Sequence, residues 1–173
     1  GLAKTIAISK RRQETLDEAR ALGLGDIYTL DPVEAVRHAD LVILCIPVQS
    51  YGAGMEQIGP HLAQGAILYD VGSVKQHVIK AVARHVPKGA YLIPGHPIAG
   101  TEHSGPAAGF PELFINRWCV LTPGREVPAE AVARLTAFWS SLGSNVEIME
   151  PQHHDMVLAI TSHIPHLVAY NIV

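Results

Sequence analysis

The stretch LVILCI at residues 41–46 is an unbroken apolar run that Pro47 ends. Such a run, bounded by a proline, is typical of a strand that is buried on both faces of its sheet. Thr5–Ser9 before it and Ala66–Asp70 after it have the same apolar character. Strands of this kind occur in parallel sheets that helices cover on both sides. The stretch therefore predicts an α/β protein with a doubly wound, Rossmann-like sheet.

Helical patterns fill the segments between these strands. Lys10–Leu22 carries an apolar stripe, as an amphipathic helix requires. Asp31-Pro32 has the residue types favoured at the N-cap and first position of a helix, which would run to about His38. The other expected elements are helices at 73–86 and 128–142, strands at 91–93, 118–121 and 146–148, a loop at 94–111, and a helix at 151–173 with a kink at Pro165. This alternation predicts a parallel sheet.

Both ends of the sequence are those expected of a segment of a longer protein. A doubly wound nucleotide fold usually begins with a strand, a glycine-rich turn and a helix, whereas this chain opens on what looks like the second strand. Gly52-x-Gly54 is not that turn, because it lacks a third glycine and does not immediately follow a strand. Val173 ends the sequence inside an apolar helical pattern. We expect residues 1–150 to form a partial nucleotide-binding domain and residues 151–173 to begin a helical one.

Composition narrows the classes of protein. The chain has 173 residues, a net charge of -3 and an isoelectric point of about 6.4, which disfavours a basic surface for nucleic acid or acidic membranes. No apolar run approaches the roughly 18 to 20 residues of a membrane helix, and we expect no secretory signal. Cys45 and Cys119 are too few for a disulfide framework. We expect a cytoplasmic protein with no nucleic-acid or membrane partner.

Ligands of doubly wound sheets lie beyond the carboxyl ends of the strands, and the first such turn is basic. It consists of Ser9, Lys10, Arg11 and Arg12. An acidic residue at this position binds the ribose 2′-hydroxyl of NAD, whereas an arginine accommodates the 2′-phosphate of NADP. The turn has no acid, so we favour NADP over NAD, with Ser9 and an arginine binding the phosphate. The alternative, a solvated basic first turn, is disfavoured by the helix macrodipole.

Two further turns are candidate cofactor contacts. Cys45-Ile46-Pro47 follows the central strand and either lies beneath the nicotinamide or only terminates the strand. Asp70-Val71-Gly72-Ser73 follows the next strand, where Gly72 permits a tight turn. The Ser73 hydroxyl either caps the following helix or faces the cofactor and substrate. Both pairs of interpretations stay open, and we expect all these residues near the cofactor.

Histidines provide the candidates for proton transfer. His96 follows a strand on the ligand side, and histidine can accept a proton near neutral pH, as loss of hydride from an alcohol requires. The segment 151–173 carries His153-His154-Asp155 and, further on, Ser162 and His166, which lie four residues apart on one helix face. Their spacing matches no familiar zinc motif such as H-E-x-x-H. We therefore expect no metal.

Three segments resemble the prephenate and arogenate (cyclohexadienyl) dehydrogenase family of the TyrA type. They are Asp70-Val-Gly-Ser-Val-Lys75, Gly95-His-Pro-Ile-Ala-Gly-Thr-Glu102 and Ser162-His-Ile-Pro-His166. A looser similarity runs through residues 104–110 to 118–123, so the resemblance spans nearly the whole chain. The middle segment is specific, whereas the first alone would be a weak signal.

The resemblance implies an NAD(P)-dependent oxidative decarboxylation of prephenate or arogenate, a step toward tyrosine. The nicotinamide would accept hydride from C4 of the substrate ring, and loss of the ring carboxylate would give a phenol. His96 would accept the proton of the C4 hydroxyl, and Ser73 would support that contact. The substrate pocket would be lined by Thr101, Glu102, Ser162, His163 and His166. A homodimer is implied for the complete protein.

The chain departs from the family in two respects. It has neither the glycine-rich first turn nor the all-helical second domain, which dimerises and supplies an arginine for the ring carboxylate. We therefore expect these 173 residues alone to be inactive. One alternative is a β-hydroxyacid dehydrogenase, which the absence of any lysine after Lys88 disfavours. Another is a non-catalytic NADP-binding module, which the presence of both His96 and Ser73 disfavours.

Overall fold

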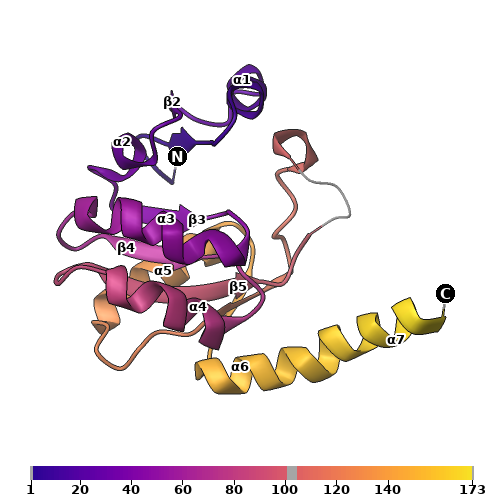
Figure 1. The fold of residues 1–173 in the computed structure, drawn as a ribbon. Helices are drawn as coiled ribbons and strands as arrows, with labels where there is room; N and C mark the ends of the chain where they lie inside the picture. Colours follow the sequence, from indigo (N-terminus) through magenta and orange to yellow (C-terminus); the bar gives the residue numbers. More distant parts are fainter. Residues whose placement is uncertain (1, 101–104, 173) are drawn as a thin grey trace.

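The computed structural model describes residues 2–100 and 105–172, which form a five-stranded and a two-stranded sheet with helices packed around them (Figure 1). The strands are β1 (Ala7–Ser9), β2 (Ile27–Thr29), β3 (Leu41–Leu44), β4 (Ile67–Asp70), β5 (Tyr91–Pro97), β6 (Trp118–Leu121) and β7 (Asn145–Ile148). The α-helices are α1 (Gln13–Ala21), α2 (Pro32–Val36), α3 (Tyr51–Ile58), α4 (Lys75–Val82), α5 (Ala129–Ser141), α6 (Pro151–Leu158) and α7 (Ile164–Ile172). Short 3-10 turns are η1 (Val48–Ser50), η2 (Gly59–His61), η3 (Ala83–His85) and η4 (Pro106–Ala108), and η5 (Ala159–His163) is a π-helix. The α/β class predicted from the sequence is confirmed.

The large sheet has the strand order β3-β4-β5-β6-β7. All neighbouring strands are parallel except β5 and β6, which are antiparallel. The prediction of a wholly parallel sheet is therefore wrong at this pair. A parallel step needs a long crossover, usually a helix, and the described residues between β5 and β6 contain only the short turn η4. The chain thus returns alongside β5 instead of crossing the sheet.

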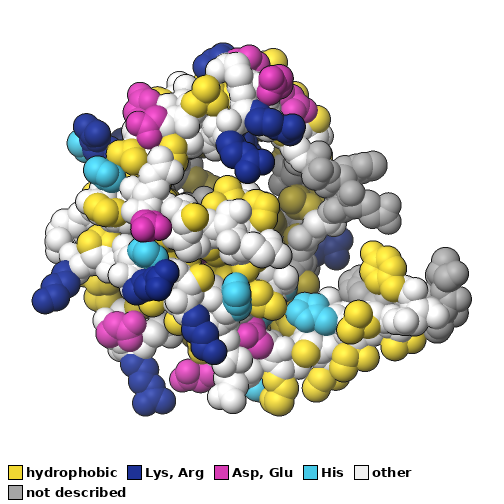
Figure 2. All heavy atoms as spheres, viewed as in Figure 1, with side chains coloured by type: hydrophobic (Ala, Val, Ile, Leu, Met, Phe, Trp, Pro, Cys, Tyr) yellow, Lys and Arg dark blue, Asp and Glu magenta, His cyan; other side chains and the backbone are white. Residues whose placement is uncertain are grey.

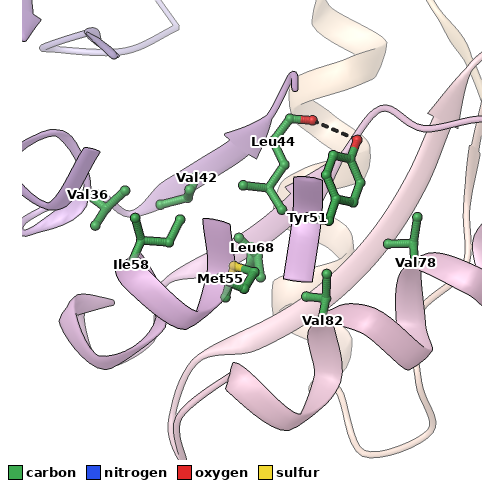
Figure 3. Close-up of a cluster of buried hydrophobic side chains, with 9 residues drawn as sticks. All are labelled: Val36, Val42, Leu44, Tyr51, Met55, Ile58, Leu68, Val78 and Val82. Atoms are coloured by element: carbon green, nitrogen blue, oxygen red, sulfur yellow. Dashed lines mark hydrogen bonds between the residues drawn. The ribbon is translucent and has the colours of Figure 1, made fainter. Parts of the chain in front are cut away.

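Strand β4 is buried on both faces, as its apolar sequence predicted. Leu68 points into the cluster beneath α3 and α4 that Figure 3 shows, where the Tyr51 hydroxyl donates to the Leu44 carbonyl oxygen (3.1 Å). Tyr69 points to the opposite face, where its ring lies 5.4 Å from that of Trp139 in α5. Both β4 side chains have an exposure of 0%. Helices thus cover both faces of the sheet, as a doubly wound fold requires.

Helix α3 was not predicted. Gly52 and Gly54 lower the intrinsic helix propensity of this segment. Packing compensates, because Tyr51, Met55 and Ile58 lie at helical spacing and are all buried in the cluster of Figure 3. The two glycines lie inside a helix, in keeping with their exclusion as a dinucleotide-binding turn.

The small sheet pairs β1 with β2 in parallel and carries α1 and α2 (Figure 1). Helix α2 begins as predicted, because the Asp31 carboxylate accepts a hydrogen bond from the Val33 N–H (2.9 Å). Strand β1 was predicted to be buried, but Ala7 is exposed and Ile8 and Ser9 are half-buried. The reason is that, within the described part of the chain, β1 has β2 as its one strand neighbour.

The segment 151–172 is helical throughout, as predicted, and it extends away from the sheets in Figure 1. Its irregular turn is the π-helix η5, which ends at His163, two residues before Pro165. Proline lacks the N–H that a regular α-helix needs at this position, which accounts for the change in hydrogen bonding. In the part of the chain that the structure describes, no helix is long and apolar enough to cross a membrane.

Candidate functional site

Three strand ends meet at one edge of the large sheet. The register pairs Leu44 with Asp70 and Asp70 with Pro94, so these residues form one row across β3, β4 and β5. The row is followed by residues 45–47 directly after β3, by residues 71–73 directly after β4, and by residues 95–96 within β5. The predicted cofactor turns Cys45-Ile46-Pro47 and Val71-Gly72-Ser73 are therefore brought together with His96. This is the edge at which doubly wound sheets bind their ligands.

A buried ion pair ties two of these strand ends together. Lys75 Nζ lies 2.7 Å from Asp70 Oδ2 and also donates to the Gly95 carbonyl oxygen, and both charged side chains are fully buried. The Asp70 carboxylate also accepts hydrogen bonds from the N–H groups of Gly72 (2.8 Å) and Gly95 (3.2 Å). Burial raises the pKa of Asp70 and lowers the pKa of Lys75, while their mutual attraction opposes both shifts. Asp70 was predicted to contact the cofactor; its carboxylate is fully buried and binds Lys75 and the backbone N–H groups of Gly72 and Gly95.

Glycine is required at position 95 because β5 passes directly over an aromatic ring. A Cβ atom at Gly95 would lie 2.2 Å from Cε2 of Tyr69, far inside van der Waals contact. Tyr69 is fully buried between the sheet and α5, so its ring has no space to move aside. The close approach fixes the backbone that immediately precedes His96.

His96 lies in a strand, not in the predicted loop. The sequence predicted that the strand would end at Ile93, but β5 continues to Pro97. The extension forms because Gly95–Pro97 pairs in antiparallel register with Cys119–Leu121 of β6. His96 is therefore held by sheet hydrogen bonding as well as by the two prolines near it.

The half-buried His96 ring contacts a second histidine. Its Nδ1 lies 3.0 Å from Nε2 of His154 in α6, and the two rings meet edge to face with their centroids 5.2 Å apart. Burial, together with the nearby His154, Lys75 and His163, lowers the pKa of His96 to about 4, although Asp155 acts in the opposite direction. His96 is therefore neutral near pH 7, as a group that accepts a proton must be.

The N-terminus of α4 is capped by Asp155, which comes from α6. Asp155 Oδ1 accepts from the Lys75 N–H (2.7 Å) and Oδ2 from the Gln76 N–H (2.9 Å). Oδ1 also lies 2.8 Å from Nδ1 of His154. Ser73 was one candidate for this cap, but its exposed hydroxyl forms no hydrogen bond within the described residues. Of the two interpretations of Ser73, capping is thus excluded, and the side chain is free to face a ligand.

The basic turn lies between β1 and α1 in the small sheet. Its backbone is anchored by a hydrogen bond from the Lys10 N–H to the Thr29 carbonyl oxygen (3.3 Å). The side chains of Arg11 and Arg12 are exposed, and neither forms an ion pair with a described residue. Ser9 is half-buried at the end of β1. The turn therefore presents exposed cations, and the charge of Lys10 acts on the Cys45 thiol that follows β3, where it opposes the rise in the pKa of that thiol caused by burial.

Two of the predicted substrate residues, Ser162 and His163, lie in the described part of the helical segment 151–172. Ser162 and His163 are in η5, and Ser162 lines a pocket of about 340 Å³ between β6, β7 and α6. Val120 lines the same pocket and is paired with His96 across β5 and β6, so both side chains lie on one face of the sheet. The pocket walls are Ile98, Trp118, Val120, Glu147, Met149, Val157, Leu158, Thr161 and Ser162. Thr101 and Glu102 lie outside the described residues, as does the side chain of His166.

Sequence reasoning assigned no role to Lys75, His154 or Asp155. A signal for His154 was present, because His154, Leu158 and Ser162 follow one another at a spacing of four and share a helix face. A polar residue on that face indicates a buried partner. No comparable signal distinguishes Lys75 from an exposed lysine, because its burial depends on Asp70 and Gly95. Within the described residues no cluster of side chains could hold a metal ion.

Residues 1–148 match the family described as "Prephenate dehydrogenase, nucleotide-binding domain". The chain belongs to this family. Cyclohexadienyl dehydrogenase of Zymomonas mobilis is 43% identical over 169 residues, which cover 98% of this chain and 57% of that protein. Prephenate dehydrogenase of Bacillus subtilis is 32% identical over 156 residues, which cover 90% of this chain and 42% of that protein. The chain thus spans about half the length of these relatives, and the resemblance inferred from its motifs is confirmed.

Solved structures of the family have the same fold. Prephenate dehydrogenase from Aquifex aeolicus superposes with a TM-score of 0.90 at 29% identity, over 99% of this chain and 62% of that chain. Arogenate dehydrogenase from Synechocystis superposes with a TM-score of 0.88 at 30% identity, over 97% of this chain and 59% of that chain. The nucleotide-binding fold predicted for the chain is therefore shared with dehydrogenases named for either substrate.

Proposed function

We propose that the full-length protein oxidatively decarboxylates prephenate or arogenate with a nicotinamide cofactor, giving 4-hydroxyphenylpyruvate or tyrosine. The observation that carries this proposal is His96, a neutral histidine held beside three strand ends of a nucleotide-binding domain. Family membership supports the substrate class. A related enzyme from A. aeolicus was crystallised with hydroxyphenyl propionate and NAD+. The phenol ring of that compound is of the kind that this reaction produces.

His96 would act as the proton acceptor. The nicotinamide, held by the turns at 45–47 and 70–73, would supply the two-electron acceptor for hydride from C4, while His96 would take the proton of the C4 hydroxyl. The bond to the ring carboxylate then breaks, carbon dioxide leaves, and the electron pair completes the aromatic ring. His96 returns the proton to the phenolate oxygen. Ser73, exposed at the adjacent turn, would support the contact with the substrate hydroxyl.

NADP is the cofactor that the basic turn favours. Arg11 and Arg12 are exposed and unpaired within the described residues, and Ser9 at the strand end is not an acid. We expect the double variant Arg11→Ala and Arg12→Ala to lower kcat/KM for NADP by about 10-fold or more, because charge-assisted phosphate contacts are lost. The kcat/KM for NAD should change little. Arg134→Ala, at an exposed site on α5, is the control. Equal losses with both nucleotides would contradict an NADP-specific role.

The proposal is tested by turnover of the full-length protein. Prephenate or arogenate is supplied with NADP or NAD, and the absorbance of the reduced nicotinamide is followed for the wild type and for His96→Ala. We expect the variant to lose about 100-fold or more in kcat, because its proton acceptor is gone. His77→Ala, an exposed histidine on α4, is the matched control and should keep its rate.

The pair of substrate and nucleotide with the highest kcat/KM identifies both. If folded wild-type protein binds nucleotide but turns over none of the four pairs, the proposed function is wrong and the chain belongs to a nucleotide-binding module. If His96→Ala keeps its rate, the reaction stands but another group accepts the proton.

A further inference from the structure

The Nδ1 atom of His96 is committed to a protein partner. It lies 3.0 Å from Nε2 of His154, whose own side chain is fully buried in α6. One of these two nitrogens must carry the proton that joins them, since two bare nitrogens would repel each other. The ring nitrogen of His96 that remains for a substrate is Nε2. If the shared proton is on Nδ1 of a neutral His96, Nε2 of that ring is bare and can accept another proton. If the shared proton is on His154, the one proton of His96 is on Nε2, which then cannot accept.

The protonation state of Asp155 determines which of the two histidines donates the hydrogen bond between them. Its oxygens accept from the N–H groups of Lys75 and Gln76, and a backbone N–H can only donate. These hydrogen bonds and the one from His154 lower the pKa of Asp155, outweighing the opposite effect of burial. Asp155 is therefore an anion near neutral pH and must accept, which places a proton on Nδ1 of His154 (2.8 Å).

The neutral state of His154 determines which of its two ring nitrogens is bare. Burial lowers the pKa of His154, so its ring bears one proton near pH 7 and that proton is on Nδ1. Its Nε2 is then a lone-pair acceptor. His96 must donate to it from Nδ1, which leaves Nε2 of His96 bare.

We propose that His154 and Asp155 are positioning residues that hold His96 as the Nδ1–H tautomer, so that Nε2 accepts the substrate proton. The proposal deepens the function proposed above and rests on it. When Nε2 takes up a proton, His96 becomes a cation at the end of a chain of hydrogen bonds that terminates in the Asp155 carboxylate. Among the described residues, the titratable groups that act on His96 are His154 and Asp155 from α6, Lys75 from α4 and His163 from η5. Of these, only the Asp155 carboxylate favours that cation.

Nitrogen-15 NMR of histidine-labelled full-length protein tests the tautomer directly. Long-range nitrogen–proton correlations distinguish a protonated ring nitrogen from a bare one. We expect His96 and His154 each to be protonated at Nδ1 and bare at Nε2. A His96 ring protonated at Nε2 would overturn the proposal. The spectrum requires no turnover, so this result is separate from the His96→Ala assay that tests the proposed function.

Substitutions at His154 add a kinetic test. His154→Leu removes the acceptor, and we expect kcat to fall by about 10-fold or more with little change in KM, because proton acceptance depends on the tautomer. His154→Gln keeps an oxygen that can accept from His96 and should recover most of that loss. His153→Gln, the exposed neighbour on α6, is the matched control for kcat and for the spectrum.

Equal losses in the Leu and Gln variants, with the His96 tautomer unchanged in both, would show that His154 only fills space and would overturn the proposal. If the Leu variant does not fold, the wild-type spectrum and the Gln variant still decide between the two outcomes.

Discussion

Lys75 brings a charged group into the interior, and its partners explain why it can stay there. Its ammonium group contacts the Asp70 carboxylate and the Gly95 carbonyl oxygen, and the Asp70 carboxylate takes two further N–H donors. The pair thus holds two backbone segments together, the turn at Gly72 and the Gly95 backbone that precedes His96. Breaking such a pair by removing one partner is costly because the other charge stays buried.

We expect Lys75→Met to lower the free energy of unfolding by about 3–5 kcal/mol, since Asp70 would keep its position without a counter-charge. Urea unfolding followed by circular dichroism measures the change. Lys80→Met, an exposed lysine on the same helix, is the control and should alter stability by about 0.5 kcal/mol or less. A loss below about 1 kcal/mol for Lys75→Met would mean that Asp70 becomes protonated or solvated without penalty.

Among the elements, β5 constrains the site most tightly. Its last three residues pair with β6, and its glycine lies against the ring of Tyr69. We expect Gly95→Ala to destabilise the fold by about 1–3 kcal/mol, because the added methyl group overpacks a filled core, and to reduce turnover by displacing His96. Thermal unfolding and the nicotinamide assay measure the two effects.

Gly100→Ala is the matched control for this substitution. A Cβ atom there would meet no atom of the described residues within 4 Å, although Gly100 lies only five residues further along the same segment. An unchanged melting temperature for Gly95→Ala would show that Tyr69 can move aside and that the close approach is not a constraint.

The elements also show which features a sequence can reveal. Strands β3 and β4 were predictable because an apolar run carries its own signal. The length of β5 and the direction of β6 were not, because they depend on pairing between residues about twenty-five apart in the chain. In the same way, His96 was identified from a local motif. The contact with His154 was not, because it joins positions 58 residues apart.

On the scale of the whole molecule, β4 of the large sheet is buried on both faces, whereas the C-terminal helices leave large apolar side chains exposed. Figure 2 shows hydrophobic side chains gathered along this helical segment. Ile160, Ile164 and Leu167 are 61%, 51% and 62% exposed in the described structure. A contiguous apolar surface of this kind on a soluble domain promotes association.

We expect the 173-residue chain to self-associate through this surface, and Ile164→Arg with Leu167→Arg to shift it toward the monomer. Size-exclusion chromatography with light scattering measures the mass across a range of concentrations. Gln152→Arg, an exposed polar position on α6, adds charge without removing apolar surface and serves as the control. A monomeric wild-type chain at all concentrations would contradict the prediction.

The cap that Asp155 places on α4 can form only late in the synthesis of the chain. A ribosome delivers the three strand ends, His96 and the whole of α4 well before it delivers His154 and Asp155, which lie 58 and 80 residues beyond their partners. Domains form from the N-terminus as synthesis proceeds. A growing chain can therefore form the strand ends of β3, β4 and β5 early, while His96 still lacks its hydrogen-bond partner His154. On the function proposed above, proton acceptance by His96 would therefore depend on α6, which is synthesised after the strand ends that would bind the nucleotide.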